Sequence, residues 1–271
     1  MPGSNVRSRI KESYGGLVAP MRNRFFHGKK LDVYHFELET AYGIEMRRLI
    51  NRYVVGRGVV CGLDVTACDD PCAIQISPGF AIDGRGREII VPSPSRPIPI
   101  PYPVVAMVCE PSDDKEQSES KDDYRESSEA GWLTVSICYH ECAVGPVSTN
   151  GHGCGPWSGG EAGSIRESYR IEFTPGQVEP VDHACSDLMS SHGAVSPAEI
   201  AKIVTKGCCD FGCDPCIPLA VLKLTCGDTA CEIEDGSIDI TVRPVVITNP
   251  VIFGVSCIAG DADDSDQAKA H

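Results

Sequence analysis

Cysteine is the residue that most restricts how this chain folds, because 15 of its 271 residues are Cys, an odd number. A disulfide framework normally accompanies secretion. The N-terminal stretch from Met1 to Arg7 has no apolar run after its charges, so no secretory signal is expected. The sequence therefore favours metal ligation or unpaired core thiols over disulfides.

The densest cysteine group lies between residues 208 and 216 and predicts a structural zinc site. Two thiolates separated by two residues with a turn between them reach one tetrahedral ion at about 2.3 Å each. Such a pair of cysteines, a zinc knuckle, supplies only two ligands, so Cys142 with Cys154 is the predicted second pair. Disulfides within the cluster and unpaired buried thiols remain the alternatives to zinc. Other partners for the knuckle are Cys138, His152, His183 and Cys185. The predicted metal ligands are Cys142, Cys154, Cys208, Cys209, Cys213 and Cys216.

A second, smaller cysteine motif is Cys68-Asp69-Asp70-Pro71-Cys72. It closes a short loop, so a local bridge between its two cysteines is the expected pairing if they are bonded at all. Cys208 and Cys209 are adjacent, and neighbours on a strand point to opposite faces, so they are not expected to serve one site together.

No motif in the sequence predicts an enzyme. The chain has no P-loop, no Gly-x-Ser-x-Gly elbow and no His-Glu-x-x-His. Gly84-Arg85-Gly86 lies between two strand-like runs with no helix after it, which indicates a tight hairpin loop and not a dinucleotide site. No catalytic residue is therefore assigned.

Composition and periodicity predict a β-rich α+β fold. Apolar residues at spacings of three and four predict a helix over 31–55, with Asp32 as its cap and Gly56 or Gly58 at its end. The 27 Gly and 20 Pro residues are spread without a period, which favours many turns between short strands. The helix is therefore expected to pack on an antiparallel meander. A larger antiparallel β domain with a cysteine-rich cluster is expected to follow. Strands are predicted at 59–66, 73–77, 80–83, 87–91, 104–109, 132–139, 168–173, 217–224, 237–242 and 245–248, with a second helix at 197–205.

The predicted organisation has four parts. They are an N-terminal arm over 1–30, a helix with a small β module over 31–103, a cysteine-rich β domain over 104–260 containing a mobile acidic loop at 110–130, and a disordered acidic tail over 261–271.

Charge is distributed unevenly along the chain. The net charge of −14 argues against a nucleic-acid binder, and no apolar run approaches the roughly 20 residues that cross a bilayer. Residues 1–60 carry 11 Lys and Arg against 5 Asp and Glu, whereas the remainder carries 13 against 33. A basic head on an acidic body favours docking between neighbouring subunits or onto an acidic partner.

Several stretches in the first third of the chain resemble an N-terminal module of phage-tail-like proteins: Gly28 to Phe36, Arg47 to Arg52, Gly56 to Val65, Ser77 to Asp83 and Gly86 to Val91. Similar modules accompany contractile injection systems as baseplate or tail-fibre attachment components. The resemblance implies a structural protein that forms a homo-oligomer and binds other tail or baseplate proteins. It also implies assembly in the cytoplasm within a particle that is released to the exterior.

The helix arginines Arg47, Arg48 and Arg52 are then the predicted subunit contacts, because the guanidinium fork suits interfaces. Two other functions remain open on the residues alone. A secreted, disulfide-stabilised binding or adhesion module would have almost no free thiols. A metal-dependent enzyme would need three cluster ligands and an open coordination position.

Overall fold

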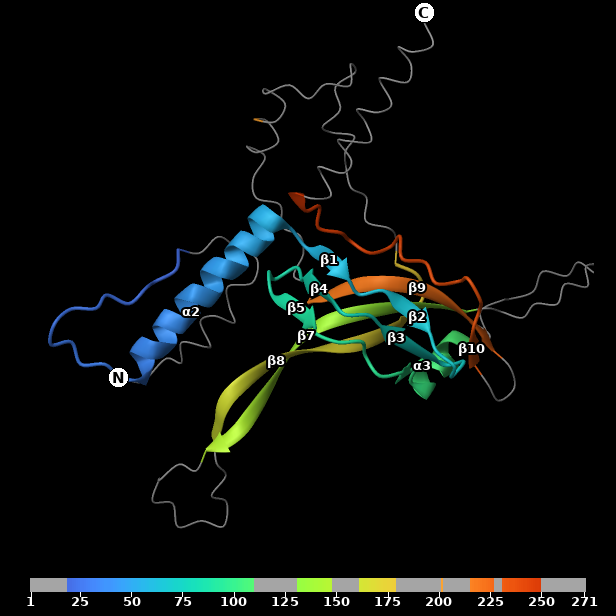
Figure 1. Ribbon diagram of the computed structural model, residues 1–271, viewed down its shortest axis with the longest axis horizontal. Coiled ribbons are helices and arrows are strands. Elements are labelled where there is room, and N and C mark those ends of the chain that lie inside the picture. The colour runs from blue at the N-terminus through green and yellow to red at the C-terminus, as the bar shows by residue number, and fades with distance from the viewer. Residues whose placement is uncertain are drawn as a thin grey trace, which may run out of the picture.

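The computed structural model describes residues 19–109, 131–147, 161–178, 201, 215–226 and 231–249. Within them the chain forms three antiparallel sheets and two α-helices, which confirms the β-rich α+β class (Figure 1). Parts of the predicted organisation lie outside these residues: most of the arm, the loop at 110–130, the tail at 261–271 and all of the helix at 197–205 except Ala201.

Helix α2 (Val33–Ile50) begins at Asp32 and continues into a π-helical turn, η1 (Asn51–Val55). The side chain of Asp32 accepts the His35 N–H, and the His35 ring accepts the Asp32 N–H, which is a reciprocal capping box. Gly56 then ends the helix with φ at 92°, a conformation that glycine adopts without steric cost. The predicted helix, its cap and its end are therefore confirmed. The predicted packing of this helix along a sheet is wrong, because Ala41 is its only buried residue.

The strands after the helix form two three-stranded sheets. The predicted run at 59–66 is split at Leu63, whose φ is +59°. Its two halves belong to different sheets, so the strands do not form one meander. One sheet has the order β1 (Gly58–Gly62), β4 (Gly79–Ile82) and β5 (Glu88–Val91), and the other has β2 (Val65–Ala67), β3 (Ala73–Ile76) and β6 (Ile98–Pro99).

The third sheet is the largest, and its strands run in the order β10-β9-β7-β8. The predicted strands at 132–139 and 168–173 are parts of longer strands that pair along a long hairpin extending beyond the body (Figure 1). The predicted strand at 217–224 is confirmed, and β10 was not predicted. The four strands are β7 (Gly131–Val147), β8 (Glu161–Pro175), β9 (Cys216–Cys226) and β10 (Cys231–Ile233).

The strand predicted at 104–109 is wrong, because these residues belong to helix α3 (Tyr102–Cys109). The carbonyl of Pro101 accepts the N–H groups of Val104 and Val105, which starts a helical turn despite the β-branched residues. Pro103 near the helix start loses no hydrogen bond there, because the first N–H groups of a helix have no intrahelical partner.

The predicted strands at 237–242 and 245–248 are also wrong, since only isolated bridges form there. Asp239 bridges Val221 of β9, and Val245 bridges Val59 of β1. The segment crosses from one sheet to another, and Pro244, which lacks an N–H, lies beside the second bridge. Neither sheet therefore gains a full strand.

One hydrophobic core holds the sheets together. Its fully buried members include Ile76 and Ile89 from the small sheets and Leu133, Ile137 and Leu219 from the large sheet. This cluster spans both predicted units, 31–103 and 104–260, so the described parts of the two units share a core.

Candidate functional sites

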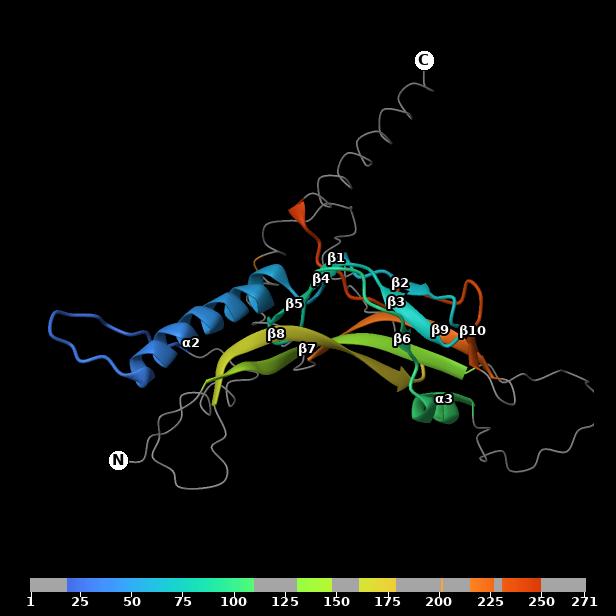
Figure 2. The ribbon, with the colours of Figure 1, turned by 60° about the horizontal axis from the view of Figure 1, so that its bottom comes forward.

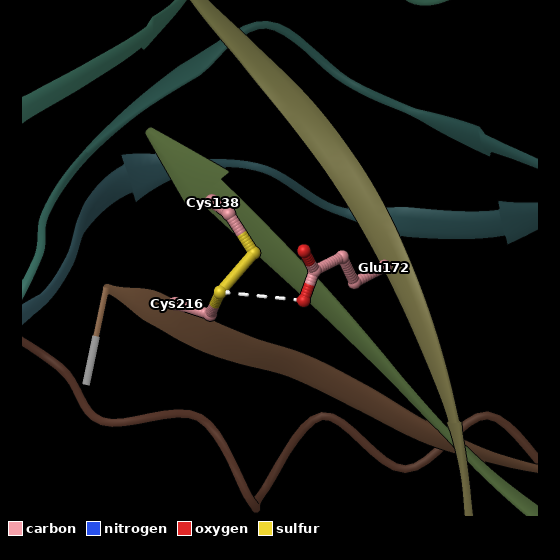
Figure 3. Close-up of side chains that lie close together, drawn as sticks. All are labelled: Cys138, Glu172 and Cys216. Carbon is pink, nitrogen blue, oxygen red and sulfur yellow. Dashed lines mark hydrogen bonds between the residues drawn. A yellow bond between two sulfur atoms is a disulfide. The ribbon is translucent and has the colours of Figure 1, made fainter. Parts of the chain in front are cut away.

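Two features of the molecule are candidates for function: a cysteine pair with a carboxylate on the large sheet, and the helical arm that projects from the body. Cys138 on β7 lies directly opposite Cys216 at the start of β9, with their Cα atoms 4.2 Å apart. Opposed residues at non-hydrogen-bonded positions of an antiparallel pair approach to about 4.5 Å, which brings such thiols within bonding reach. The two cysteines form a disulfide (Figure 3).

Glu172 on β8 reaches across β7 to this disulfide. Its Oε2 lies 3.6 Å from the Sγ of Cys216, whereas its Oε1 pairs with the Nη2 of Arg170 at 2.6 Å. The candidate ligand atoms of Cys138, Cys216 and Glu172 all lie within 4.8 Å of one another (Figure 3). The group could therefore hold a metal ion once the disulfide is reduced, because the thiolate is the metal ligand.

Most of the predicted zinc ligands do not belong to the group formed by Cys138, Glu172 and Cys216. Of the predicted six, only Cys216 belongs to it, and there it is disulfide-bonded. Cys142, four residues beyond Cys138 on β7, is a half-buried free thiol outside the group. The other four, Cys154, Cys208, Cys209 and Cys213, lie outside the described residues.

Glu172 was missed, and Cys138 was named only as an alternative partner. Their approach depends on the order β9-β7-β8, which joins strands distant in the sequence. Local spacing carries no signal for such an arrangement.

Disulfides are more prominent than the sequence indicated. Cys72 bonds to Cys231, 159 residues away, and this bond ties the start of β3 to β10. The predicted local bridge between Cys68 and Cys72 is therefore wrong. Cys109 is also disulfide-bonded. The free cysteines among the described residues are Cys61, Cys68 and Cys142.

Cys68 is a poor candidate for a nucleophile. Partial burial raises the pKa of its thiol, and the neighbouring carboxylates of Asp69 and Asp70 raise it further. The thiolate is thus disfavoured.

The helical arm consists of residues 19–32 and helix α2. Both ribbon views show α2 projecting away from the sheets (Figures 1 and 2). Ala41 is the only buried residue among its 18. The exposed apolar side chains of the arm are Met21, Phe25, Phe26, Leu31, Val33, Tyr34, Phe36 and Ile50.

The C-terminal end of α2 is anchored on the turn between β4 and β5. Asn51 Nδ2 donates to the carbonyl of Gly86 at 2.9 Å and to Oε1 of Glu88 at 2.8 Å. Arg47 pairs with the same Glu88 oxygen at 2.7 Å. The predicted hairpin loop at 84–86 is confirmed, and it is the platform that holds the helix.

The predicted contact arginines all lie at this anchored end. Arg47 is half exposed and is paired within its own chain. Arg48 and Arg52 each bury an Nε atom that has no hydrogen-bond partner among the described residues. The guanidinium of Arg52 also lies 5.1 Å from the ring centre of Tyr53, within the range of a cation–π contact.

No protein-family model matches the chain, and no curated protein matches it. Among the helices that the structure describes, none is long and apolar enough to cross a membrane.

Proposed function

We propose that this chain is a non-enzymatic structural component of a phage-tail-like particle of the contractile-injection type, and that it assembles into an oligomer through its basic arm and helix α2. The observation that carries the proposal is the projecting helix, which buries one residue of 18 in its own chain.

The energetics of α2 favour a partner. In proteins most helical stability comes from tertiary packing, and α2 buries only Ala41 within its own chain. The exposed fractions of Phe25, Phe26 and Phe36 are 59%, 63% and 63%. Burying such a side chain against a neighbour contributes about 1.5–3 kcal/mol. A subunit contact along the arm therefore supplies the stabilisation that the isolated helix lacks.

The phage-tail assignment rests on the resemblance of residues 28–91, the part that contains α2 and the β4–β5 platform. A helix anchored at one end gives a rigid element that reaches a neighbour. Under this proposal Arg47, Arg48 and Arg52 remain predicted contacts, with Arg47 the most accessible of the three.

The oligomer is tested by light scattering on the purified full chain. The wild type is expected to be an oligomer, and replacing Phe25, Phe26 and Phe36 together by Ser is expected to yield monomers. Ile165→Ser is the matched control, because Ile165 is 46% exposed on β8, outside the arm. A wild type that stays monomeric up to high micromolar concentration would contradict the proposal.

The particle is tested by fractionating cells that express the tagged full chain beside its tail genes. The chain is expected to sediment with intact contractile particles and to be missing from them in the Phe-to-Ser variant. Recovery of all wild-type chain in the low-mass fraction would refute the phage-tail role.

Structural zinc is the second part of the proposal. Two thiolates and a carboxylate are ligands that zinc accepts, and a structural site is completed by a fourth protein ligand. Under reducing conditions about one zinc ion per chain is expected, with loss of that ion in Cys138→Ser and Glu172→Gln and retention in Cys61→Ser. Absence of zinc from the reduced wild type would reject this part.

The disulfides favour one rival, a secreted binding or adhesion module, because such bonds persist in oxidising compartments. Counting free thiols in the denatured, unreduced protein distinguishes the secreted module from the proposed particle component. A chain that retains many of its 15 thiols supports the intracellular particle component, and a chain with almost none supports the rival.

A further inference from the structure

Resting on the proposed assembly, we infer that the arm of one subunit docks on the opposite, acidic end of a second copy, so that subunits join head to tail. The acidic end comprises Asp69, Asp70, Glu232, Glu234 and Asp235, all exposed. It is the part of the body farthest from α2 in both ribbon views, where β2, β3 and β10 meet (Figures 1 and 2).

The acidic end is a rigid surface formed by two chain segments. The N–H of Ile233 donates to the carbonyl of Pro71 at 3.0 Å, and the disulfide between Cys72 and Cys231 joins the same two segments. Lys223 neutralises one of the five carboxylates by pairing with Glu234 at 2.7 Å. The other carboxylates have no ion pair among the described residues, so the surface remains negative.

Exposed apolar side chains also occur on elements at this end of the molecule. Helix α3 is at this end of the molecule (Figures 1 and 2), and its Tyr102 and Met107 are 82% and 66% exposed. Trp132, 38% exposed, lies opposite Lys223, the residue that pairs with Glu234. The acidic end therefore presents aromatic and thioether surface together with negative charge.

The arm has the complementary chemistry. Residues 21–31 contain Arg22, Arg24, Lys29 and Lys30 and no Asp or Glu. The Nζ of Lys29 lies 5.8 and 6.0 Å from the ring centres of Phe25 and Phe26, so cations and aromatic rings form one surface. Such a surface fits a partner that offers carboxylates beside apolar groups.

Charge also disfavours packing of α2 against α2 of another copy. The helix has the basic arm at its start and Arg47, Arg48 and Arg52 at its end, with its acidic residues Glu37, Glu39 and Glu45 between. Parallel packing places arm beside arm, and antiparallel packing places the arm beside the three arginines. Both arrangements bring like charges together, which a docking on the acidic end avoids.

Because the two complementary surfaces lie at opposite ends of one chain, the contact is heterologous. Heterologous contacts repeat from subunit to subunit until a ring closes or a filament grows. Head-to-tail docking thus predicts a closed ring or a filament, the smallest ring being a dimer with two reciprocal contacts.

The experiment uses two charge-reversed full chains. The arm variant carries Arg22→Glu and Arg24→Glu, and the end variant carries Asp69→Lys and Asp70→Lys. Each variant alone is expected to be monomeric, with affinity for itself lowered at least tenfold. Mixed in equal amounts they are expected to form a one-to-one heterodimer, because the intact arm of the end variant meets the intact acidic end of the arm variant.

Glu167→Lys, an exposed reversal on β8, is the matched control and is expected to assemble like the wild type. Normal assembly of the end variant would overturn head-to-tail docking. The proposed function would survive that result if the Phe-to-Ser variant is still monomeric, whereas a monomeric wild type would contradict both. Failure of the two folded variants to form a heterodimer would also overturn head-to-tail docking.

Discussion

Gly86 is the single residue on which the attachment of helix α2 depends most directly. Its φ is +74°, and a Cβ atom there would lie 2.2 Å from the carbonyl oxygen of Arg48. Backbone atoms on both sides of this contact leave no flexible side chain to move away. The close approach also lets Asn51 reach the Gly86 carbonyl.

Gly86→Ala is expected to destabilise the protein by about 2–4 kcal/mol, because it adds a backbone clash to the cost of positive φ. Urea unfolding measures the change. Gly28→Ala is the matched control, since Gly28 has φ of +83° with nothing within 4 Å. The control is expected to lose only about 1 kcal/mol. Equal losses in the two variants would mean that the contact with Arg48 is unimportant.

Asp83 organises the turn on which the helix rests. It is fully buried, and its Oδ1 accepts the N–H groups of Arg85 and Arg87 at 2.9 and 2.8 Å. Its Oδ2 accepts the Nε of Arg87 at 2.7 Å. The guanidinium of Arg87 in turn lies 4.5 Å from the ring centre of Tyr139, which connects the turn to the large sheet.

Asp83→Asn is expected to cost about 3 kcal/mol, because it leaves the largely buried Arg87 without its counter-charge. Arg170→Gln breaks a pair whose side chains are 56% and 41% exposed, and it is expected to cost less than about 1 kcal/mol. Thermal and urea unfolding of both variants measure the difference. A loss below about 1 kcal/mol in Asp83→Asn would contradict the assigned role.

At the scale of elements, helix α2 has a start that responds to pH. The hydrogen bond from His35 holds the pKa of Asp32 below its ordinary value of 3.8. A lowered pKa in the folded state means that the charged cap stabilises the helix fully above the ordinary value and loses this effect as pH falls through the lowered pKa. The affected window is therefore acidic, below about pH 4.

Below about pH 4 the wild type is expected to lose helicity in α2. The Asp32→Asn variant is not expected to show this loss, because asparagine caps a helix without a charge that titrates. Circular dichroism at 222 nm from pH 5 to pH 2 measures it as the difference between the wild type and the variant. Identical titration curves for the two proteins would show that the Asp32 carboxylate does not contribute.

Helix α3 illustrates how an element prediction fails. Its residues are β-branched or apolar at almost every position, so periodicity does not separate a strand from a buried helix. The backbone after Pro101 and the contacts of α3 with β7, β8 and β9 decide the outcome. The predicted strands at 237–242 and 245–248 are wrong for a related reason. Each segment pairs with a single residue, one on β9 and one on β1, so no continuous strand forms.

At the scale of the whole molecule, charge is separated along the chain and in space. The basic arm lies at one end and the acidic end at the other (Figure 1). Assembly that depends on this separation responds to ionic strength, since the screening length falls from about 10 Å at 0.1 M salt to about 3 Å at 1 M.

Oligomer mass measured by light scattering is therefore expected to fall as NaCl rises from 0.1 to 1 M. The arm variant with Arg22→Glu and Arg24→Glu serves as the reference, because it lacks the electrostatic contact and its mass is expected to stay constant. An oligomer that is unchanged in 1 M NaCl would assign assembly to the apolar side chains of the arm alone.

The sequence by itself determined the features that depend on neighbours within a few residues. These are helix α2 with its Asp32 cap and Gly56 end, the hairpin turn at 84–86 and most of the short strands. Tertiary structure decided which distant residues meet. The bonds from Cys72 to Cys231 and from Cys138 to Cys216, with Glu172 beside the second, join strands through sheet order and register. Local periodicity specifies which side of a strand is buried, but it does not specify which strand lies next to it.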